Sequence, residues 1–227
     1  MVGFLKARIA GGDEEPEAKY RASVVTQLQS RHLAGKRVPL DEAYVPTRLL
    51  SPQSGLTEGE LLNDGTATLH YLWPELASEI ATIPPPSVTL SEMLAHGQRI
   101  LLTGEAGSGK SSLLAYCAIL IAKVELDGLE NTPTEDLPVH LHLADLEQQL
   151  VLAREQMAWT NDPIAPLQEV LARTGYRSRG LERVLAAAAA EGRLFLLLDG
   201  WDEVPGIGLG LTGRWLQALL RSYPATR

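Results

Sequence analysis

The second half of the chain alternates short apolar runs with stretches in which apolar residues recur at helical spacing. The apolar runs predict buried β-strands, and the helical spacing predicts helices between and after them. The predicted strands are 100–103, 139–143 and 194–198, and the predicted helices are 111–125, 167–172, 181–190 and 214–221. Strands that alternate with helices favour an α/β fold, in which a parallel sheet carries helices on both faces.

The first fifty residues carry a weaker pattern. Residues 1–17 predict a loose arm, and apolar positions near helical spacing predict a helix over 18–34. Residues 40–50 are expected to be extended, and Pro46 limits them to an edge strand at best.

A linker separates this region from the α/β pattern. Residues 51–68 are rich in Gly, Ser, Thr and Asn and are typical of a loop, and a short helix is expected from Glu75. Three prolines, Pro84 to Pro86, then favour an extended spacer. We therefore divide the chain into a mainly helical and extended N-terminal extension, 1–86, and an α/β domain, 87–227.

The strongest chemical signal lies just after the strand predicted at 100–103. Its residues are Gly104, Glu105, Ala106, Gly107, Ser108, Gly109, Lys110 and Ser111. They match the phosphate-binding loop, in which a glycine and four residues precede Gly-Lys-Ser or Gly-Lys-Thr. Glycines let the backbone approach phosphates closely, and the amide groups from about Ala106 to Ser112 can point at the β-phosphate. In this interpretation Lys110 contacts the β- and γ-phosphate oxygens, and the Ser111 hydroxyl binds Mg²⁺.

A second signal follows the last predicted strand. That strand ends in Asp199, and phosphate-loop enzymes hold Mg²⁺ through a carboxylate at such a strand end. Asp202 and Glu203 come shortly afterwards and are candidates to orient or polarise an attacking water. Many ATPases have Glu directly after this aspartate, whereas Gly200 stands there in this chain.

Composition restricts the alternatives. Lys plus Arg is 20 and Asp plus Glu is 28, so the formal net charge is −8, which argues against binding to duplex nucleic acid. Cys117 is the only cysteine, which excludes an internal disulfide and favours a reducing, cytoplasmic setting. No apolar run is long enough to span a bilayer, and the N-terminus lacks the apolar core of a signal peptide.

Taken together, the two signals resemble those of the NACHT family of signal-transduction (STAND) ATPases. The similarity rests on the phosphate loop and on the ending Asp199-Gly200-Trp201-Asp202-Glu203. Three further stretches resemble segments of that family. They are 137–146, where Ala144 replaces a common basic residue, 191–194 before the magnesium strand, and 44–46, a segment often seen upstream in bacterial members.

The resemblance implies a P-loop NTPase sheet that binds ATP or ADP with Mg²⁺ and self-associates in the ATP state. Bacterial members often serve in defence or signalling. The chain has no Asn-Lys-x-Asp stretch specific for guanine, which also favours adenine. In that family the sheet continues with a strand that carries a sensor residue. This sequence stops at Arg227, about where that strand should begin, so we expect a fragment whose sheet lacks it.

Three functions follow from these signals. The first is a switch ATPase that hydrolyses ATP slowly, with Lys110, Asp202 and Glu203 as catalytic residues and Ser111 and Asp199 at the metal. The second is a nucleotide-binding scaffold that self-associates without hydrolysis. The third is a P-loop kinase with a small acceptor. It is the least favoured, because the basic run 173–183 is too sparse for the arginine-rich lid of such enzymes and the acidic ending favours water as the acceptor.

Several other residues invite a chemical role, but a structural one is simpler. His140 and His142 could share a face of one strand and hold a metal, but no third ligand lies near them in the sequence, so a structural role is expected. Cys117 is expected to be a small buried hydrophobe. Trp201 is expected to pack inside the protein. A solvated face is expected for the arginines that could otherwise supply an arginine finger, Arg173, Arg177, Arg179 and Arg183. The glycine-rich stretch 206–213 predicts a flexible loop, and the resemblance alone places Pro46 and Thr47 near an adenine.

Overall fold

The computed structural model describes residues 14–31, 37–45, 49–50, 87–90, 94, 99–123, 135–152, 158–176, 180–204 and 210–227. The chain divides into two compact units. Met1–Val45 and Gln98–Arg227 form the first unit, and Pro46–Gly97 forms the second. In the second unit, β1 (Leu49–Leu50) pairs antiparallel with β2 (Ser87–Val88). The first unit contains the phosphate-loop sequence and the acidic ending.

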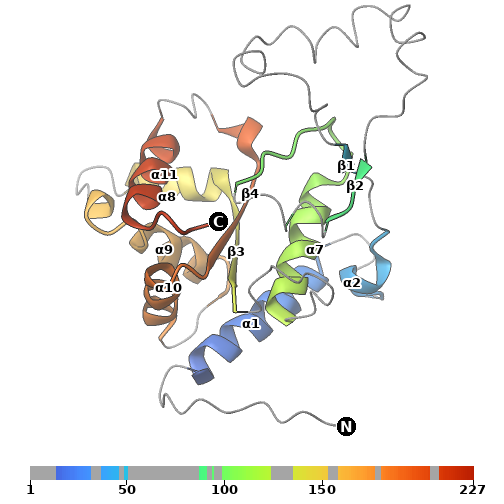
Figure 1. Ribbon diagram of the computed structural model, residues 1–227, viewed down its shortest axis with the longest axis horizontal. Helices are drawn as coiled ribbons and strands as arrows, with labels where there is room; N and C mark the ends of the chain where they lie inside the picture. Colours follow the sequence, from blue (N-terminus) through green and yellow to red (C-terminus); the bar gives the residue numbers. More distant parts are fainter. Residues whose placement is uncertain are drawn as a thin grey trace, which may run out of the picture. The chain divides into compact units, whose positions relative to one another are not determined.

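A two-stranded parallel sheet lies inside the first unit (Figure 1). β3 (Leu137–His142) pairs with β4 (Leu194–Asp199), so that His142 lies opposite Asp199 at the carboxyl ends. Both strands are largely buried, as expected for runs of Leu, Val and Phe. The prediction of strands near 139–143 and 194–198 is confirmed, and so is their parallel pairing.

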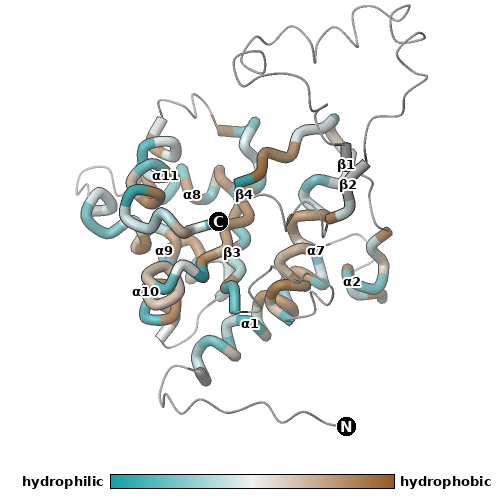
Figure 2. Tube along the Cα trace, viewed as in Figure 1, coloured by the Kyte–Doolittle hydropathy of each residue, from teal (hydrophilic) through white to brown (hydrophobic). Residues whose placement is uncertain are grey.

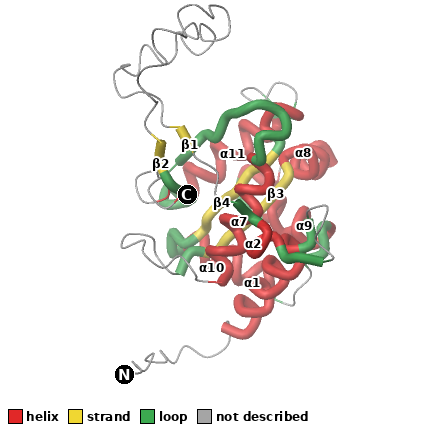
Figure 3. The backbone as a smooth tube through the Cα atoms, turned by 90° about the vertical axis from the view of Figure 1, so that its right-hand side faces the viewer, coloured by secondary structure: helices red, strands yellow, loops and turns green. Residues whose placement is uncertain are grey.

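Helices cover both sides of this sheet, as predicted. Seven α-helices lie among the described residues: α1 (Glu14–Gln29), α2 (Leu40–Ala43), α7 (Lys110–Lys123), α8 (Leu143–Leu152), α9 (Ala165–Arg173), α10 (Leu181–Ala190) and α11 (Leu211–Ser222). Figure 1 shows α7 on one side of the two strands and α8 to α11 on the other. Figure 3 looks from the side of α2 and α7 and shows the strands behind them. The four helices predicted after residue 110 are confirmed within a few residues of their bounds.

The core joins these layers through apolar side chains. Figure 2 shows apolar residues along β4 and α7. Trp215 of α11 is fully buried, and its indole Nε1 donates a hydrogen bond of 2.8 Å to the carbonyl oxygen of Pro163. At the start of α11, the backbone N–H and hydroxyl of Thr212 both donate to Glu147 of α8. The hydrophobic contacts and these polar contacts hold α11 against α8.

The helix α1 packs along α7 and covers the outer edge of β3. The buried hydroxyl of Tyr20 donates to the carbonyl oxygen of Pro138 at 2.9 Å. Arg21 donates to the carbonyl oxygens of Ile121, at the end of α7, and of Asp136, just before β3. This helix begins at Glu14 and ends at Gln29, so the predicted loose arm over 1–17 is wrong for residues 14–17, and the prediction that the helix reaches residue 34 is wrong too.

The strand predicted at 100–103 is absent. These residues have no regular secondary structure, and Ile100 and Leu101 are 43% and 74% exposed. A strand needs hydrogen bonds from a neighbour, and no strand in the described part of the chain pairs with this segment. The edge of β4 away from β3 is paired instead with the backbone of Arg227, which donates to the Leu194 oxygen at 3.1 Å and accepts from the Leu196 nitrogen at 2.7 Å.

Some further expectations differ from the structure or lie outside it. Residues 40–43 form the short helix α2 rather than extended chain, and 49–50 are the only strand residues among those of this segment that the structure describes. Several predictions fall outside the described residues. They are the loop at 51–68, the helix from Glu75, the Pro84–Pro86 linker, the positions of Pro46, Thr47, Arg177 and Arg179, and residues 205–209 of the glycine-rich stretch.

Candidate functional site

The phosphate-loop sequence closes around its own lysine. Lys110 is the first residue of α7, and its Nζ donates to the carbonyl oxygens of Gly104 and Glu105, at 2.7 Å each. The amide of Ser108 donates back to the Glu105 oxygen at 3.2 Å. The loop therefore forms a tight turn with a cation at its centre.

Glycine is required in this loop for two different reasons. Gly107 and Gly109 have positive φ angles of 80° and 89°, which residues with a β-carbon rarely adopt. A β-carbon at either position would touch nothing, so the requirement there is conformational. At Gly104, by contrast, a β-carbon would lie 2.9 Å from the hydroxyl oxygen of Ser108. Conformation therefore explains Gly107 and Gly109, and the close approach of Ser108 explains Gly104.

The first turn of α7 presents exposed hydrogen-bond donors next to the loop. Ser111 and Ser112 are exposed in its first turn, and the amide of Leu113 makes a helical hydrogen bond to Gly109 at 2.8 Å. The amides before Leu113 have no acceptor from a preceding helical turn, and the helix dipole adds positive potential there. An anion at this end of α7 would meet backbone donors, the Ser111 hydroxyl and the Lys110 ammonium group.

The acidic residues lie at the same end of the unit. Figure 1 shows the amino end of α7 and the carboxyl ends of β3 and β4 at one end of the layers. Asp199 is the last residue of β4, and its Oδ1 accepts a hydrogen bond of 3.0 Å from the amide of Gly200. Ser111 and Asp199 offer the hard oxygen ligands that Mg²⁺ takes, together with phosphate and water. Among the described residues, no three His, Cys, Asp or Glu side chains gather as a metal site, so a metal held by protein side chains alone does not fit this part of the chain.

The turn after Asp199 is built around a histidine that the sequence analysis did not assign to the site. Gly200 has a positive φ of 76°, and a β-carbon there would lie 2.8 Å from Nε2 of His142. The imidazole ring therefore leaves no room for a β-carbon at position 200. In the next turn, the 3₁₀ helix η2 (Trp201–Glu203), a carboxylate oxygen of Glu203 lies 3.6 Å from the same Nε2.

No pattern in the sequence alone indicates this contact. His142 is two residues from His140, and only the strand register places it opposite Asp199. The side chain of His142 is 30% exposed at the end of β3. His140, two residues earlier on the same strand, is buried.

Burial keeps His140 neutral. Desolvation, with smaller contributions from the Arg31 guanidinium and from His142, lowers the pKa of this imidazole to about 4, against an opposing effect of Asp199. Its Nδ1 lies 3.5 Å from Nη1 of Arg31, whereas Nε2 is buried without a hydrogen-bond partner among the described residues.

Two further expectations are resolved by burial. Cys117 is buried in α7 as predicted, and burial raises the pKa of its thiol to about 12. Trp201 was expected to pack inside, and this is wrong: 42% of it is exposed, because η2 projects beyond the end of the sheet.

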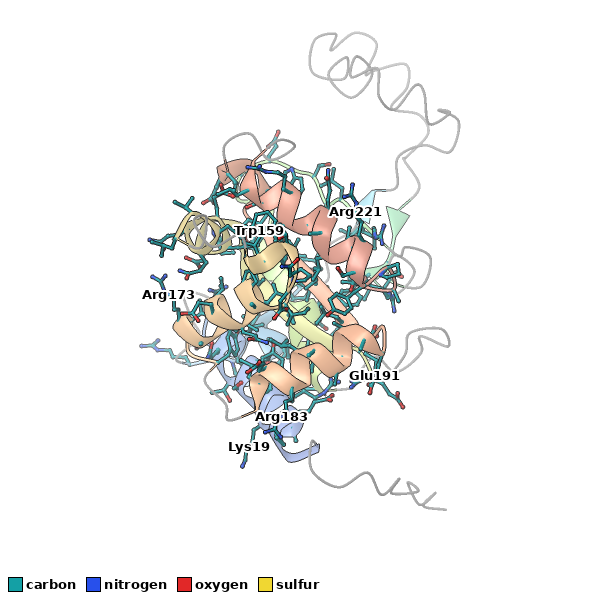
Figure 4. The ribbon with its side chains drawn as sticks, turned by 90° about the vertical axis from the view of Figure 1, so that its left-hand side faces the viewer. Lys19, Trp159, Arg173, Arg183, Glu191 and Arg221 are labelled. Atoms are coloured by element: carbon teal, nitrogen blue, oxygen red, sulfur yellow. The ribbon has the colours of Figure 1, made fainter. Side chains whose placement is uncertain are left out.

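Two arginines of the basic run, Arg173 and Arg183, lie among the described residues. Arg173 at the end of α9 and Arg183 in α10 are exposed, as predicted for a solvated face. Figure 4 shows both side chains on the outer surface of the layer formed by α9, α10 and α11. That layer lies across the sheet from α7 (Figure 1).

No helix among the described residues combines the length and the apolar character needed to cross a bilayer. Comparison of the chain with protein-family models, with curated proteins and with solved structures finds no match.

Proposed function

We propose that this chain is a P-loop NTPase domain that binds ATP or ADP with Mg²⁺ and acts as a slowly hydrolysing switch of the NACHT and STAND type. The observation that carries the proposal is the loop from Gly104 to Lys110, with its lysine held by two carbonyl oxygens at the start of α7. The ammonium group of Lys110 is thus surrounded by backbone groups of the loop. Phosphate oxygens of a bound nucleotide could replace the two carbonyl oxygens as its hydrogen-bond acceptors.

The proposal assigns a role to the phosphate loop, to Asp199 at the end of β4 and to the acidic turn that follows it. The backbone from Gly104 to Ser112 holds the phosphates, and Lys110 neutralises charge on the β- and γ-phosphates. Ser111 and Asp199 would hold the magnesium ion, which would neutralise charge on the phosphates. Glu203 or Asp202 orients the attacking water. The nucleotide state controls self-association of the domain.

A second candidate, a nucleotide-binding scaffold that does not hydrolyse, is favoured by the turn after Asp199. The position directly after this aspartate is Gly200, and the ring of His142 packs against it. Glu203 is 60% exposed and contacts His142, so it needs a rearrangement to hold a water at the γ-phosphate. The geometry of this turn therefore favours slow hydrolysis or none.

Release of phosphate from Mg-ATP tests the first candidate against the second. For a switch ATPase we expect slow release that falls to background in Lys110→Ala and falls about 100-fold in Glu203→Gln, as for loss of a general base. The matched control is Glu182→Gln, an exposed carboxylate in α10 across the sheet, which should leave the rate unchanged.

Two outcomes separate the candidates. Nucleotide binding with no release above the Lys110→Ala background, together with self-association in the presence of ATP, would support the scaffold. Release that persists in Lys110→Ala would contradict the assignment of the loop.

A further inference from the structure

A polar cavity of about 280 Å³ lies beside β3, and no residue of the phosphate loop lines it. Its walls come from the end of α1, the carboxyl half of β3, the first turn of α8 and the end of α9. The side chains that bear on its chemistry are Gln27, Arg31, His140, Asp145 and Tyr176. This volume lies at the lower limit for small-molecule sites, so the cavity can hold only a small ligand.

Two opposite charges line this cavity without pairing. Arg31 follows α1, and Asp145 lies in the first turn of α8. Neither side chain forms an ion pair with any residue in the part of the chain that the structure describes. A cation and a carboxylate that face one cavity from different walls match a ligand that carries both charges.

The remaining polar groups are hydrogen-bond donors and acceptors without net charge. Arg31 can only donate, so in its 3.5 Å contact with His140 the Nδ1 atom must accept, and Nε2 of the neutral ring carries the proton. That Nε2 is buried and has no acceptor among the described residues. Tyr176 stays a neutral phenol, because burial raises its pKa. A buried donor beside a cation is suited to a carboxylate oxygen.

We propose that this cavity binds a small zwitterion of the amino-acid type. Arg31 anchors the ligand's carboxylate, with the imidazole of His140 as a second donor, and Asp145 pairs with its ammonium group. Gln27 and Tyr176 provide neutral polar contacts at the wall. The cavity is distinct from the phosphate loop, since no residue of 104–112 lines it. Its nearest link to the proposed nucleotide site is His142, which lines the cavity and lies 3.6 Å from a carboxylate oxygen of Glu203.

Saturation-transfer NMR on the full chain with an equimolar mixture of the common amino acids tests this proposal. We expect at least one amino acid to show a saturable signal, and Arg31→Gln and Asp145→Asn each to weaken its binding at least about tenfold, as for loss of one charged contact. The matched control is Arg173→Gln, an exposed arginine on the neighbouring helix α9 that does not line the cavity, which should bind within about twofold of the native chain.

The ligand's charges provide the second arm. It compares each bound amino acid with the carboxylic acid that lacks only its ammonium group. The native chain should bind the carboxylic acid more weakly than the amino acid, whereas Asp145→Asn should bind the two with equal affinity. No saturable signal from any amino acid, or a signal that survives both charge substitutions in folded protein, would overturn the proposal. Lys110→Ala should bind the amino acid as the native chain does, which separates this site from the nucleotide site.

Discussion

His142 shows how a single side chain can set the chemistry of a turn. It lies opposite Asp199, its ring fills the space beside Gly200, and it contacts Glu203. Any side chain at position 200 would collide with this ring and would also have to adopt a positive φ. The glycine that departs from the usual ATPase pattern is therefore explained by a local packing requirement.

His140, on the same strand, makes folding sensitive to acid. Burial lowers its folded pKa to about 4, below the value of about 6.5 of an unfolded chain. Its contribution is complete at neutral pH, where the ring is neutral in both states. As the pH falls below about 6.5, His140 takes up a proton in the unfolded chain but stays neutral in the folded chain. The free energy of unfolding therefore decreases until the pH reaches the folded pKa.

We therefore expect the free energy of unfolding of the native chain to fall, relative to that of His140→Gln, by about 3 kcal/mol between pH 7 and pH 4. Urea unfolding of both proteins across this range measures the difference. All other titrating groups are common to the two proteins, so their effects cancel. Parallel pH profiles would contradict the assignment of a buried neutral histidine.

The predictions succeeded where the local residue pattern defines the element, and they failed at residues 100–103 and at the start of α1. The helix over 181–190 has its predicted bounds, because its leucine and alanine spacing suffices to define it. Residues 100–103 are also apolar, but no strand in the described part of the chain pairs with them, and apolar character alone does not make a strand. The start of α1 is polar and was predicted as a loose arm, yet Glu17 in its first turns pairs with Arg193 beside β4 at 3.3 Å. Such long-range contacts are not visible in a local pattern.

The attachment of α1 can be tested at Tyr20. Removal of its hydroxyl in Tyr20→Phe leaves the Pro138 oxygen buried without this donor, and we expect a loss of about 1–3 kcal/mol in the free energy of unfolding. Tyr223→Phe, at the end of α11, is the matched control, because its hydroxyl has no hydrogen bond among the described contacts, and it should change stability by less than about 0.5 kcal/mol. Equal stability of Tyr20→Phe and the native chain would show that α1 is not held by this contact.

The first unit places the phosphate loop, the end of β4 and the acidic turn at one end of its layers, as expected for a parallel sheet with helices on both sides (Figure 1). The sequence correctly placed Asp199 at the end of a strand, whereas the strand expected before the phosphate loop is absent. The sequence did not predict His142 at the turn or the cavity beside β3, since both depend on strand register and on where α1 packs.

Calorimetric titration of the full chain with ADP and ATP, with and without Mg²⁺, tests the central claim most directly. The account predicts binding that Lys110→Ala weakens at least about 100-fold and that Lys123→Ala, the lysine at the other end of the same helix, leaves within about twofold. Equal nucleotide affinity of Lys110→Ala and the native chain, or no binding by folded native protein, would contradict it.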